Sequence, residues 1–124
     1  MSRFIYYNNN PLGIEEDDCV TRAITLASGL CYFDISNKLQ LTAELLGCEK
    51  LCVCCYDFLI ENVLMFREVK IDRGMTVGEF AEQHPHGIYL LRMEQHITTL
   101  IDGKIYDLWD SSEREITHAW FCGY

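Results

Sequence analysis

Apolar and polar positions along the second half of the chain follow a pattern typical of β-strands. Residues 87–93 read GIYLLRM, and a second apolar run leads from His96 to the dipeptide Asp102-Gly103. Apolar residues resume beyond this dipeptide, which is the strongest two-residue signal for a β-hairpin turn. We therefore predict a buried strand followed by a hairpin, and one more strand over residues 116–124. Residues 3–7, RFIYY, are predicted to form a short edge strand.

Helical spacing dominates the first half of the chain. Residues 18–29, DCVTRAITLASG, repeat apolar positions every three to four residues, with Asp18 as the N-cap and Gly29 as the stop signal. A second helix is predicted from about Asp34 to Leu46, and we expect its inward face to carry Ile35, Leu39, Leu45 and Leu46.

Two further helical segments are predicted. One lies near residues 56–65, although its Val, Ile and Phe content also suits a strand. The other spans about residues 77–83, because Thr76 and Glu79 have the spacing of a capping box. Helices come first and antiparallel strands later, so the predicted class is α+β, with N-terminal helices packed on a C-terminal antiparallel β-sheet.

The hairpin brings chemically useful side chains to one face. With Asp102 and Gly103 as the turn, Thr98 faces Asp107 and His96 faces Trp109, and all four share one side because side chains alternate along a strand. His96 and Asp107 then lie on a diagonal that long side chains can bridge. One bulge residue would break this parity and make Asp110 the partner instead.

Length and composition narrow the possibilities. The chain has 124 residues, 49% of them apolar, which fits one domain over residues 1–124. Residues 1–10, MSRFIYYNNN, lack the apolar stretch of a signal peptide, and no run approaches the ~20 apolar residues of a membrane span. We expect a cytoplasmic protein without a membrane partner. The net charge of -9 and the scattered basic residues argue against a nucleic-acid partner.

Seven cysteines are present, and without an export signal we expect them to be thiols in a reducing compartment. Four lie close together, namely Cys48, Cys52, Cys54 and Cys55. Usual zinc sites take two separated Cys pairs, and four ligands within eight residues leave little backbone to enclose a tetrahedral ion. Buried or incidental thiols are therefore favoured over a metal, and we expect neither a metal nor another cofactor.

Cys19 has the strongest case as a nucleophile. It falls in the first turn of a predicted helix, where unpaired N–H groups stabilise a thiolate and a developing oxyanion. The charges of Asp17 and Asp18 act against ionisation of the thiol unless Asp18 caps the helix or pairs with Arg22. The alternatives are structural: a small buried residue for Cys19, a hydrogen-bonded strand histidine for His96 and a solvated acid for Asp107.

The order of these residues resembles the papain-like cysteine peptidase superfamily, especially its small bacterial members of the NlpC and bacteriocin-processing types. Asp-Cys opens a helix, and a strand His and an Asp on the next strand follow. Asp107-Leu108-Trp109 also matches the family's spacing between the third catalytic residue and a shielding tryptophan. Residues 18–29, 76–91 and 96–113 further resemble a group of small uncharacterised proteins from phages and their bacterial hosts.

The resemblance implies Cys19 as nucleophile, His96 as general base and acid, Asp107 as the orienting carboxylate and Trp109 as the shield. The family's oxyanion hole uses the backbone N–H of the nucleophile and usually a Gln six residues before it, a position that here holds Gly13. Candidates for the missing amide are Asn8, Asn9, Asn10 and the more remote Gln95.

Two functions follow as expectations. The first is a papain-like cysteine hydrolase, a peptidase, isopeptidase or amidase that acts on a protein or peptide substrate through an acyl-enzyme. The second is a catalytically weak or inactive scaffold of the same type, a phage-encoded binding or inhibitor protein that occupies a host protein in the host cytoplasm. The Gly at the oxyanion position and the acidic composition favour the second reading.

Overall fold

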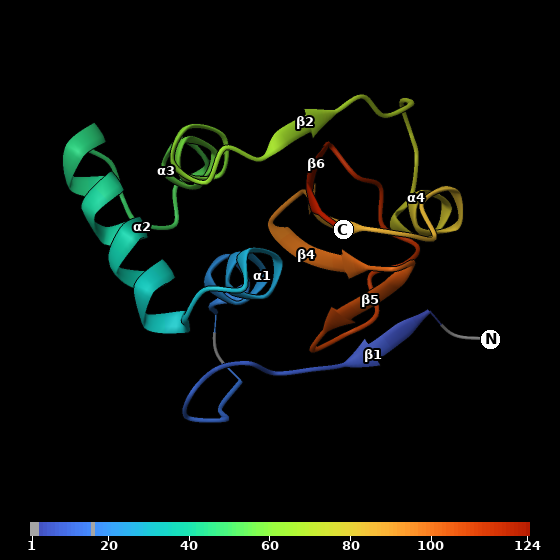
Figure 1. The fold of residues 1–124 in the computed structure, drawn as a ribbon, viewed down its shortest axis with the longest axis horizontal. Helices are drawn as coiled ribbons and strands as arrows, with labels where there is room; N and C mark the ends of the chain where they lie inside the picture. The colour runs from blue at the N-terminus through green and yellow to red at the C-terminus, as the bar shows by residue number, and fades with distance from the viewer. Residues whose placement is uncertain (1–2, 16) are drawn as a thin grey trace.

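A six-stranded sheet forms the centre of the part of the chain that the computed structural model describes, residues 3–15 and 17–124 (Figure 1). The strands lie in the order β1-β5-β4-β3-β6-β2. Their bounds are Phe4–Tyr6 for β1, Arg67–Val69 for β2, Ile88–Met93 for β3, His96–Ile101 for β4, Lys104–Asp107 for β5 and His118–Gly123 for β6. Every strand predicted from the sequence is therefore present, including the N-terminal edge strand.

The sheet is mixed, which corrects the expectation of an antiparallel C-terminal sheet. β1 pairs with β5 in parallel, with Phe4 opposite Ile105, whereas the other neighbouring strands are antiparallel. A parallel pair needs a long crossover between its strands. Here the helices and three other strands lie between β1 and β5 in the chain. The alternation of apolar residues does not show which edge a distant short strand joins.

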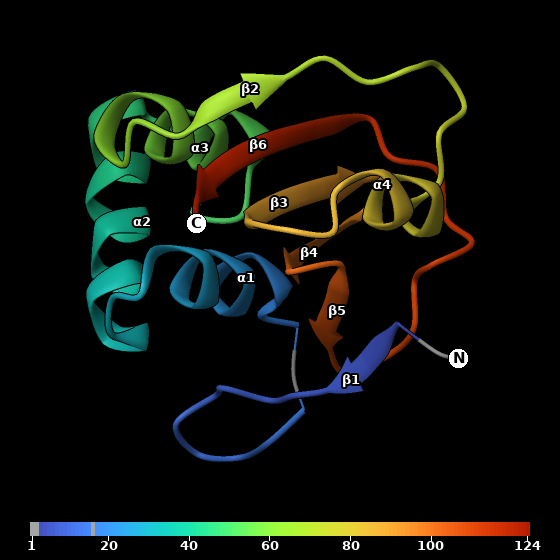
Figure 2. The ribbon, with the colours of Figure 1, turned by 45° about the vertical axis from the view of Figure 1, so that its right-hand side comes forward.

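Helices cover both faces of the sheet, and the α+β class is confirmed. The bounds are Cys19–Ser28 for α1, Tyr32–Leu46 for α2, Val53–Phe58 for α3 and Val77–Gln83 for α4, with a π-helical turn, η1, over Leu59–Val63 (Figure 2). Leu90 of β3 packs with α1, α2, α3 and η1, whereas Leu91 packs with α4. Consecutive strand residues point to opposite faces, so one strand serves both cores.

The first helix forms as the apolar spacing predicts. Val20, Ala23, Ile24 and Ala27 are buried in the core shared with α2 and α3, and Gly29 ends the helix in the left-handed region with φ of 73°. Asp18 occupies the N-cap position, but its side chain makes no capping hydrogen bond. That carboxylate has other partners, described with the site below.

The inward face of α2 differs from the prediction at its C-terminal end. Ile35 and Leu39 are fully buried as expected, but Leu45 and Leu46 are 75% and 40% exposed. Thr42 and Ala43 occupy the buried positions of the last turns instead. Apolar residues outnumber the positions that face the core here, so the two leucines lie in solvent.

The segment near residues 56–65 is helical, and its alternative reading as a strand is wrong. It begins earlier than predicted, at Val53, and continues from α3 into η1. Both bonds of the capping box at α4 form, since the Glu79 N–H donates to Thr76 Oγ1 and the Thr76 N–H donates to Glu79 Oε1. None of the helices in the described part of the chain has the length and apolar character needed to cross a bilayer.

The predicted hairpin turn is present with the predicted register. Ile101 pairs with Lys104, and Asp102 and Gly103 both have positive φ, 49° and 77°. Positive φ at both central residues is the requirement of a type I′ turn, which Asp-Gly meets at low cost. The Asp102 carboxylate also accepts a hydrogen bond from the Gly87 N–H at 2.9 Å. The turn thus fixes the register of β4 against β5, on which the candidate site depends.

Gly103→Ala is expected to destabilise the protein by about 1–2 kcal/mol, because an L-residue pays this cost in the left-handed region. An added Cβ would lie 3.4 Å from Pro85 Cα and 3.5 Å from the Ala81 carbonyl oxygen, which are ordinary contacts, so the expected cost comes from the backbone conformation and not from a clash. Urea unfolding followed by circular dichroism measures the change. Lys104→Ala, at the exposed next position, is the control, and an equal loss in both variants would contradict this account of the turn.

Candidate active site

Cys19 and His96 lie at the ends of two packed elements. Cys19 is the first residue of α1 and His96 is the first residue of β4. α1 packs against β4 (Figure 1). The Thr99 hydroxyl of β4 donates a buried 2.8 Å hydrogen bond to the Ala23 carbonyl of α1. This bond fixes α1 along β4, so the Cys19 and His96 side chains lie at the same end of the two packed elements. They line one cavity of about 560 Å³.

His96 and Asp107 form the pair that the hairpin register predicts. The His96 Nε2 atom lies 2.7 Å from Asp107 Oδ2, and the two side chains are 7% and 2% exposed. Asp110 stays exposed and accepts bonds from Ser112 of its own loop. The strand alternation is therefore unbroken between His96 and Asp107, and Asp107 rather than Asp110 is the partner of His96.

The charge state of His96 follows from its partners. Burial lowers the pKa of the imidazole, but hydrogen bonds with Asp107 and with the Cys19 side chain outweigh burial and raise the pKa to about 9. Burial raises the pKa of the Asp107 carboxyl. Several hydrogen bonds, led by the one from His96, together with the charge of His96, outweigh burial and hold this pKa below its usual range. At neutral pH the pair is thus an imidazolium and a carboxylate.

Trp109 covers the histidine ring. The two ring centroids are 4.5 Å apart, with 36° between the ring planes. Trp109 itself is 41% exposed, so it lies at the surface against the His96 ring and is not a core residue. Its outer face lies near the Arg114 guanidinium, at 5.8 Å from the ring centroid. The contact between His96 and Trp109 proposed from the sequence is therefore present.

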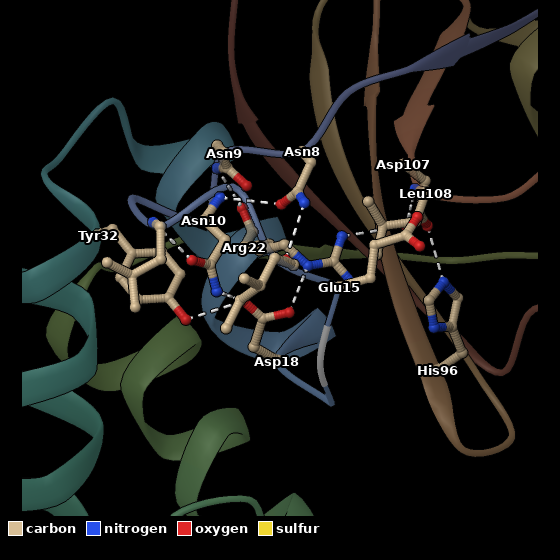
Figure 3. A network of polar contacts seen from close by, with 12 residues as sticks. Asn8, Asn9, Asn10, Glu15, Asp18, Arg22, Tyr32, His96, Asp107 and Leu108 are labelled. Carbon is tan, nitrogen blue, oxygen red and sulfur yellow. Dashed lines mark hydrogen bonds and ion pairs between the residues drawn. The ribbon is translucent and has the colours of Figure 1, made fainter.

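Arg22 joins the two halves of the site, which the sequence reasoning did not foresee. Its Nε donates to Asp18 Oδ1 at 2.6 Å and its Nη1 lies 3.3 Å from Asp107 Oδ1, so one guanidinium bridges two carboxylates (Figure 3). All three side chains are at most 8% exposed. The i, i+4 spacing of Asp18 and Arg22 predicted the first contact, but no local signal indicates the second, across 85 positions.

Asp18 is the centre of a buried polar network. It accepts hydrogen bonds from the Asn10 amide at 2.9 Å and the Tyr32 hydroxyl at 2.8 Å, in addition to Arg22 (Figure 3). Burial raises the pKa of this carboxyl, and these three donors outweigh burial and lower it overall. The network ties the loop before α1 to the first turn of α1 and to α2. The residue before Cys19 is therefore held in place from several sides.

The candidate oxyanion donors lie in different places. The Asn10 amide donates to Asp18, the Asn9 amide donates to the Arg22 carbonyl at 3.0 Å, and the Asn8 amide donates to the Ile14 carbonyl at 2.9 Å. These three side chains build the loop between β1 and α1, and none of them lines the cavity. Gln95 does line it, in the exposed two-residue turn between β3 and β4, with φ of 61°. Of the four candidates, Gln95 is the one that the fold brings to the cavity.

The cavity has an apolar wall and a polar rim. Leu51, Val53 and Tyr56 come from the start of α3 and the link that precedes it, while Asp17 and Glu94 bring carboxylates. Its volume lies within the range of small-molecule and peptide pockets. Arg92 also lines the cavity, where its guanidinium pairs with Asp57. The cavity therefore offers both apolar and charged side chains beside Cys19.

The residues that line this cavity contain no group of converging metal ligands. Across the described ranges, three ligating side chains come together at Cys48, Cys52 and Cys54, and these three do not line the cavity. The chemistry available at the cavity is thus that of a thiol, a charged imidazole and a buried carboxylate. Comparison with protein-family models, curated proteins and solved structures finds no match to this chain.

Proposed function

We propose that the chain is a papain-like cysteine hydrolase that acts on an amide, thioester or isopeptide bond. One observation carries the proposal: His96, paired with the buried Asp107 carboxylate at 2.7 Å, lines the same cavity of about 560 Å³ as Cys19. Covalent acyl transfer requires a nucleophile, a base and a group that orients the base. The nucleophile at the start of a helix and the histidine on a packed strand support a papain-like arrangement.

In the proposed reaction, the Cys19 thiolate attacks the carbonyl carbon of the scissile bond, and the carbonyl oxygen takes up the negative charge. The Cys19 backbone N–H at the start of α1 and the Gln95 amide donate to this oxygen. As the intermediate collapses, the His96 imidazolium gives its proton to the leaving amine, and a thioester to Cys19 remains. Neutral His96 then takes a proton from water, whose oxygen attacks the thioester, and the released thiolate regains its imidazolium partner.

Asp107 acts on the substrate only through His96. A carboxylate hydrogen-bonded to one ring nitrogen directs the other nitrogen toward the nucleophile and stabilises the imidazolium. Arg22 in turn holds Asp107 through Oδ1, the oxygen that does not bond His96. Asp107 and Arg22 are thus positioning residues in this proposal, whereas Cys19 and His96 are catalytic residues.

A peptide or protein segment with neutral or basic side chains is the proposed substrate. Asp17 and Glu94 place carboxylates at the cavity, and the positive charge of Arg92 is already paired with Asp57. The net charge of -9 also favours a neutral or basic substrate, since it repels acidic partners and nucleic acid. A cytoplasmic location, in the host cell if the chain is phage-encoded, agrees with seven free thiols.

Limited labelling with iodoacetamide tests the proposal. At pH 7 we expect Cys19 to react roughly tenfold or more faster than the exposed Cys31, because a thiolate held by an imidazolium is the reactive species. His96→Ala should slow labelling at Cys19 and leave Cys31 unchanged. Peptide mass spectrometry reads all seven cysteines in one sample. Equal rates at Cys19 and Cys31, with no fall on His96→Ala, would refute the proposed nucleophile.

A second function, a binding or inhibitor protein on the same scaffold, is favoured by the oxyanion region. Gly13 stands where the resemblance calls for Gln, and the amides of Asn9 and Asn10 already donate to the protein itself. Capture of a host protein by wild type and by Cys19→Ala separates the two functions. Equal capture and an equal biological effect support binding, while loss of the effect in Cys19→Ala supports catalysis.

A further inference from the structure

Three thiols converge outside the candidate active site. The Sγ atoms of Cys48, Cys52 and Cys54 all lie within 4.8 Å of one another, and the Sγ atoms of Cys52 and Cys54 are 2.9 Å apart. All three are free cysteines. They come from the link between α2 and α3 and from the first turn of α3, and we call them the thiol cluster. The backbone folds to bring them together, since the Cys52 N–H donates to the Glu49 carbonyl at 3.0 Å.

The fourth cysteine of this stretch points elsewhere. Cys55 is fully buried, and its thiol donates to the Leu39 carbonyl of α2 at 3.3 Å. The sequence argument against four ligands in so short a stretch therefore holds for Cys55. It does not hold for the other three, because one turn of backbone suffices to place three sulfurs around a point. Cys54 is exposed, so the cluster opens to solvent.

We propose that Cys48, Cys52 and Cys54 bind one thiophilic divalent cation, with Zn²⁺ as the first candidate and solvent as its fourth ligand. Two thiolates at the Zn–S distance and a tetrahedral angle lie about 3.8 Å apart. The three sulfurs lie within 4.8 Å of one another, and the Cys52 and Cys54 Sγ atoms, 2.9 Å apart, would separate by roughly 1 Å to bind the ion. Soft sulfur ligands favour such ions over Mg²⁺ or Ca²⁺. Each thiol that binds releases a proton, and the cation offsets the charge of the thiolates that form.

The thiol cluster is adjacent in sequence to two residues that line the cavity of the candidate active site. Leu51 and Val53, which line the cavity, alternate with Cys52 and Cys54 along the backbone. A bound cation would cross-link the link after α2 to the start of α3 and so fix this wall of the cavity. This inference rests on the sulfur positions alone and stands whether or not Cys19 is a nucleophile.

Metal content and cobalt spectroscopy test the proposal on the full chain. The protein is reduced, stripped with a chelator and titrated anaerobically with Co²⁺, then with Zn²⁺. We expect one Co²⁺ per chain, a thiolate-to-cobalt charge-transfer band, and loss of that band as Zn²⁺ displaces Co²⁺. Cys54→Ser and Cys52→Ser should lose the band. Cys31→Ser, exposed at the start of α2, and Cys19→Ser should keep it.

Circular dichroism of each variant confirms folding, and Cys54→Ser is the decisive one because its side chain is exposed. Absence of the band in the reduced wild type, or its persistence in folded Cys54→Ser, would overturn the proposal. The proposal would also be overturned if the reduced wild type bound no more Zn²⁺ per chain than Cys54→Ser. Cys19→Ser retains the thiol cluster. A failure of metal binding is therefore seen by comparing wild type with Cys54→Ser, and a failure of the proposed hydrolase is seen in the labelling of Cys19.

Discussion

Arg22→Met is expected to destabilise the protein by about 3 kcal/mol at pH 7, because it leaves two buried carboxylates without their shared cation. Asp18 and Asp107 are 8% and 2% exposed, and Arg22 contacts both. Methionine retains much of the apolar volume of the arginine stem, so the loss reports charge and hydrogen bonding more than packing. Urea unfolding followed by circular dichroism gives the difference in free energy.

The pH dependence separates this explanation from a simple packing defect. The pKa of the Asp18 carboxyl is lowered although burial raises it, and Arg22 is the first of the donors that outweigh burial. A depressed carboxylate pKa stabilises the fold above the unfolded value, and that stabilisation is lost as pH falls. The difference between wild type and Arg22→Met should therefore narrow below about pH 4.

Arg73→Met is the matched control, since Arg73 lies exposed between β2 and α4. We expect it to change stability by less than about 0.5 kcal/mol. If both methionine variants had the same small effect, Arg22 would not hold the two carboxylates together in solution. If the loss of unfolding free energy in Arg22→Met stayed constant down to pH 3, it would instead indicate a packing defect.

The hairpin was predictable because its signals are local. Asp102-Gly103 determines the turn, the turn determines the register, and the register places His96 and Asp107 on one face. The same holds for the first helix, where apolar spacing and Gly29 define the bounds. Cys19 at the start of that helix follows directly. The three proposed chemical residues are thus deducible from patterns that span about a dozen residues each.

Contacts between distant segments were not predictable in this way. The bond between Arg22 and Asp107, and the bond from Thr99 to the Ala23 carbonyl, depend on how α1 packs on β4. Neither sequence spacing nor composition specifies that packing. The parallel pairing of β1 with β5 was missed for the same reason, because a three-residue strand carries no information about its neighbour.

The errors in the helical region have a different cause. Leu45 and Leu46 have the spacing of a buried face, but the last turn of α2 buries Thr42 and Ala43 instead. The cysteine-rich link is a separate case, because the expectation of buried or incidental thiols there stays a prediction. The structure divides the four cysteines into three that converge and one that is buried against α2. Apolar character alone does not distinguish these two groups.

Asp107→Asn is expected to lower the pKa of His96 well below about 9, because the hydrogen bond and the charge of Asp107 both raise it. Burial, which lowers this pKa, is then opposed by the Cys19 side chain alone. A larger share of the ring is then neutral at pH 7, and iodoacetamide labelling of Cys19 should slow roughly tenfold or more. Titration of the imidazole protons by NMR measures the first effect, and peptide mass spectrometry measures the second.

The pH dependence of the unfolding free energy gives an independent test of the His96–Asp107 pair. The raised pKa of His96 stabilises the fold fully below the unfolded value of 6.5, and this contribution is lost as pH rises through about 9. Wild type should therefore lose roughly 3 kcal/mol over this window. Most of this slope should vanish in Asp107→Asn, even if the variant is less stable at every pH. A merely structural role for Asp107 would lower stability without changing the slope.

Asp110→Asn is the control that the sequence itself supplies, because a bulge in β5 would have made Asp110 the partner of His96. Asp110 is exposed and bonds Ser112, so its replacement should leave the His96 pKa and the pH slope of stability unchanged. If Asp110→Asn lowered the pKa and Asp107→Asn did not, the register of the hairpin would differ by one residue. Cys19 and His96 would then lack the buried carboxylate on which the proposed chemistry depends.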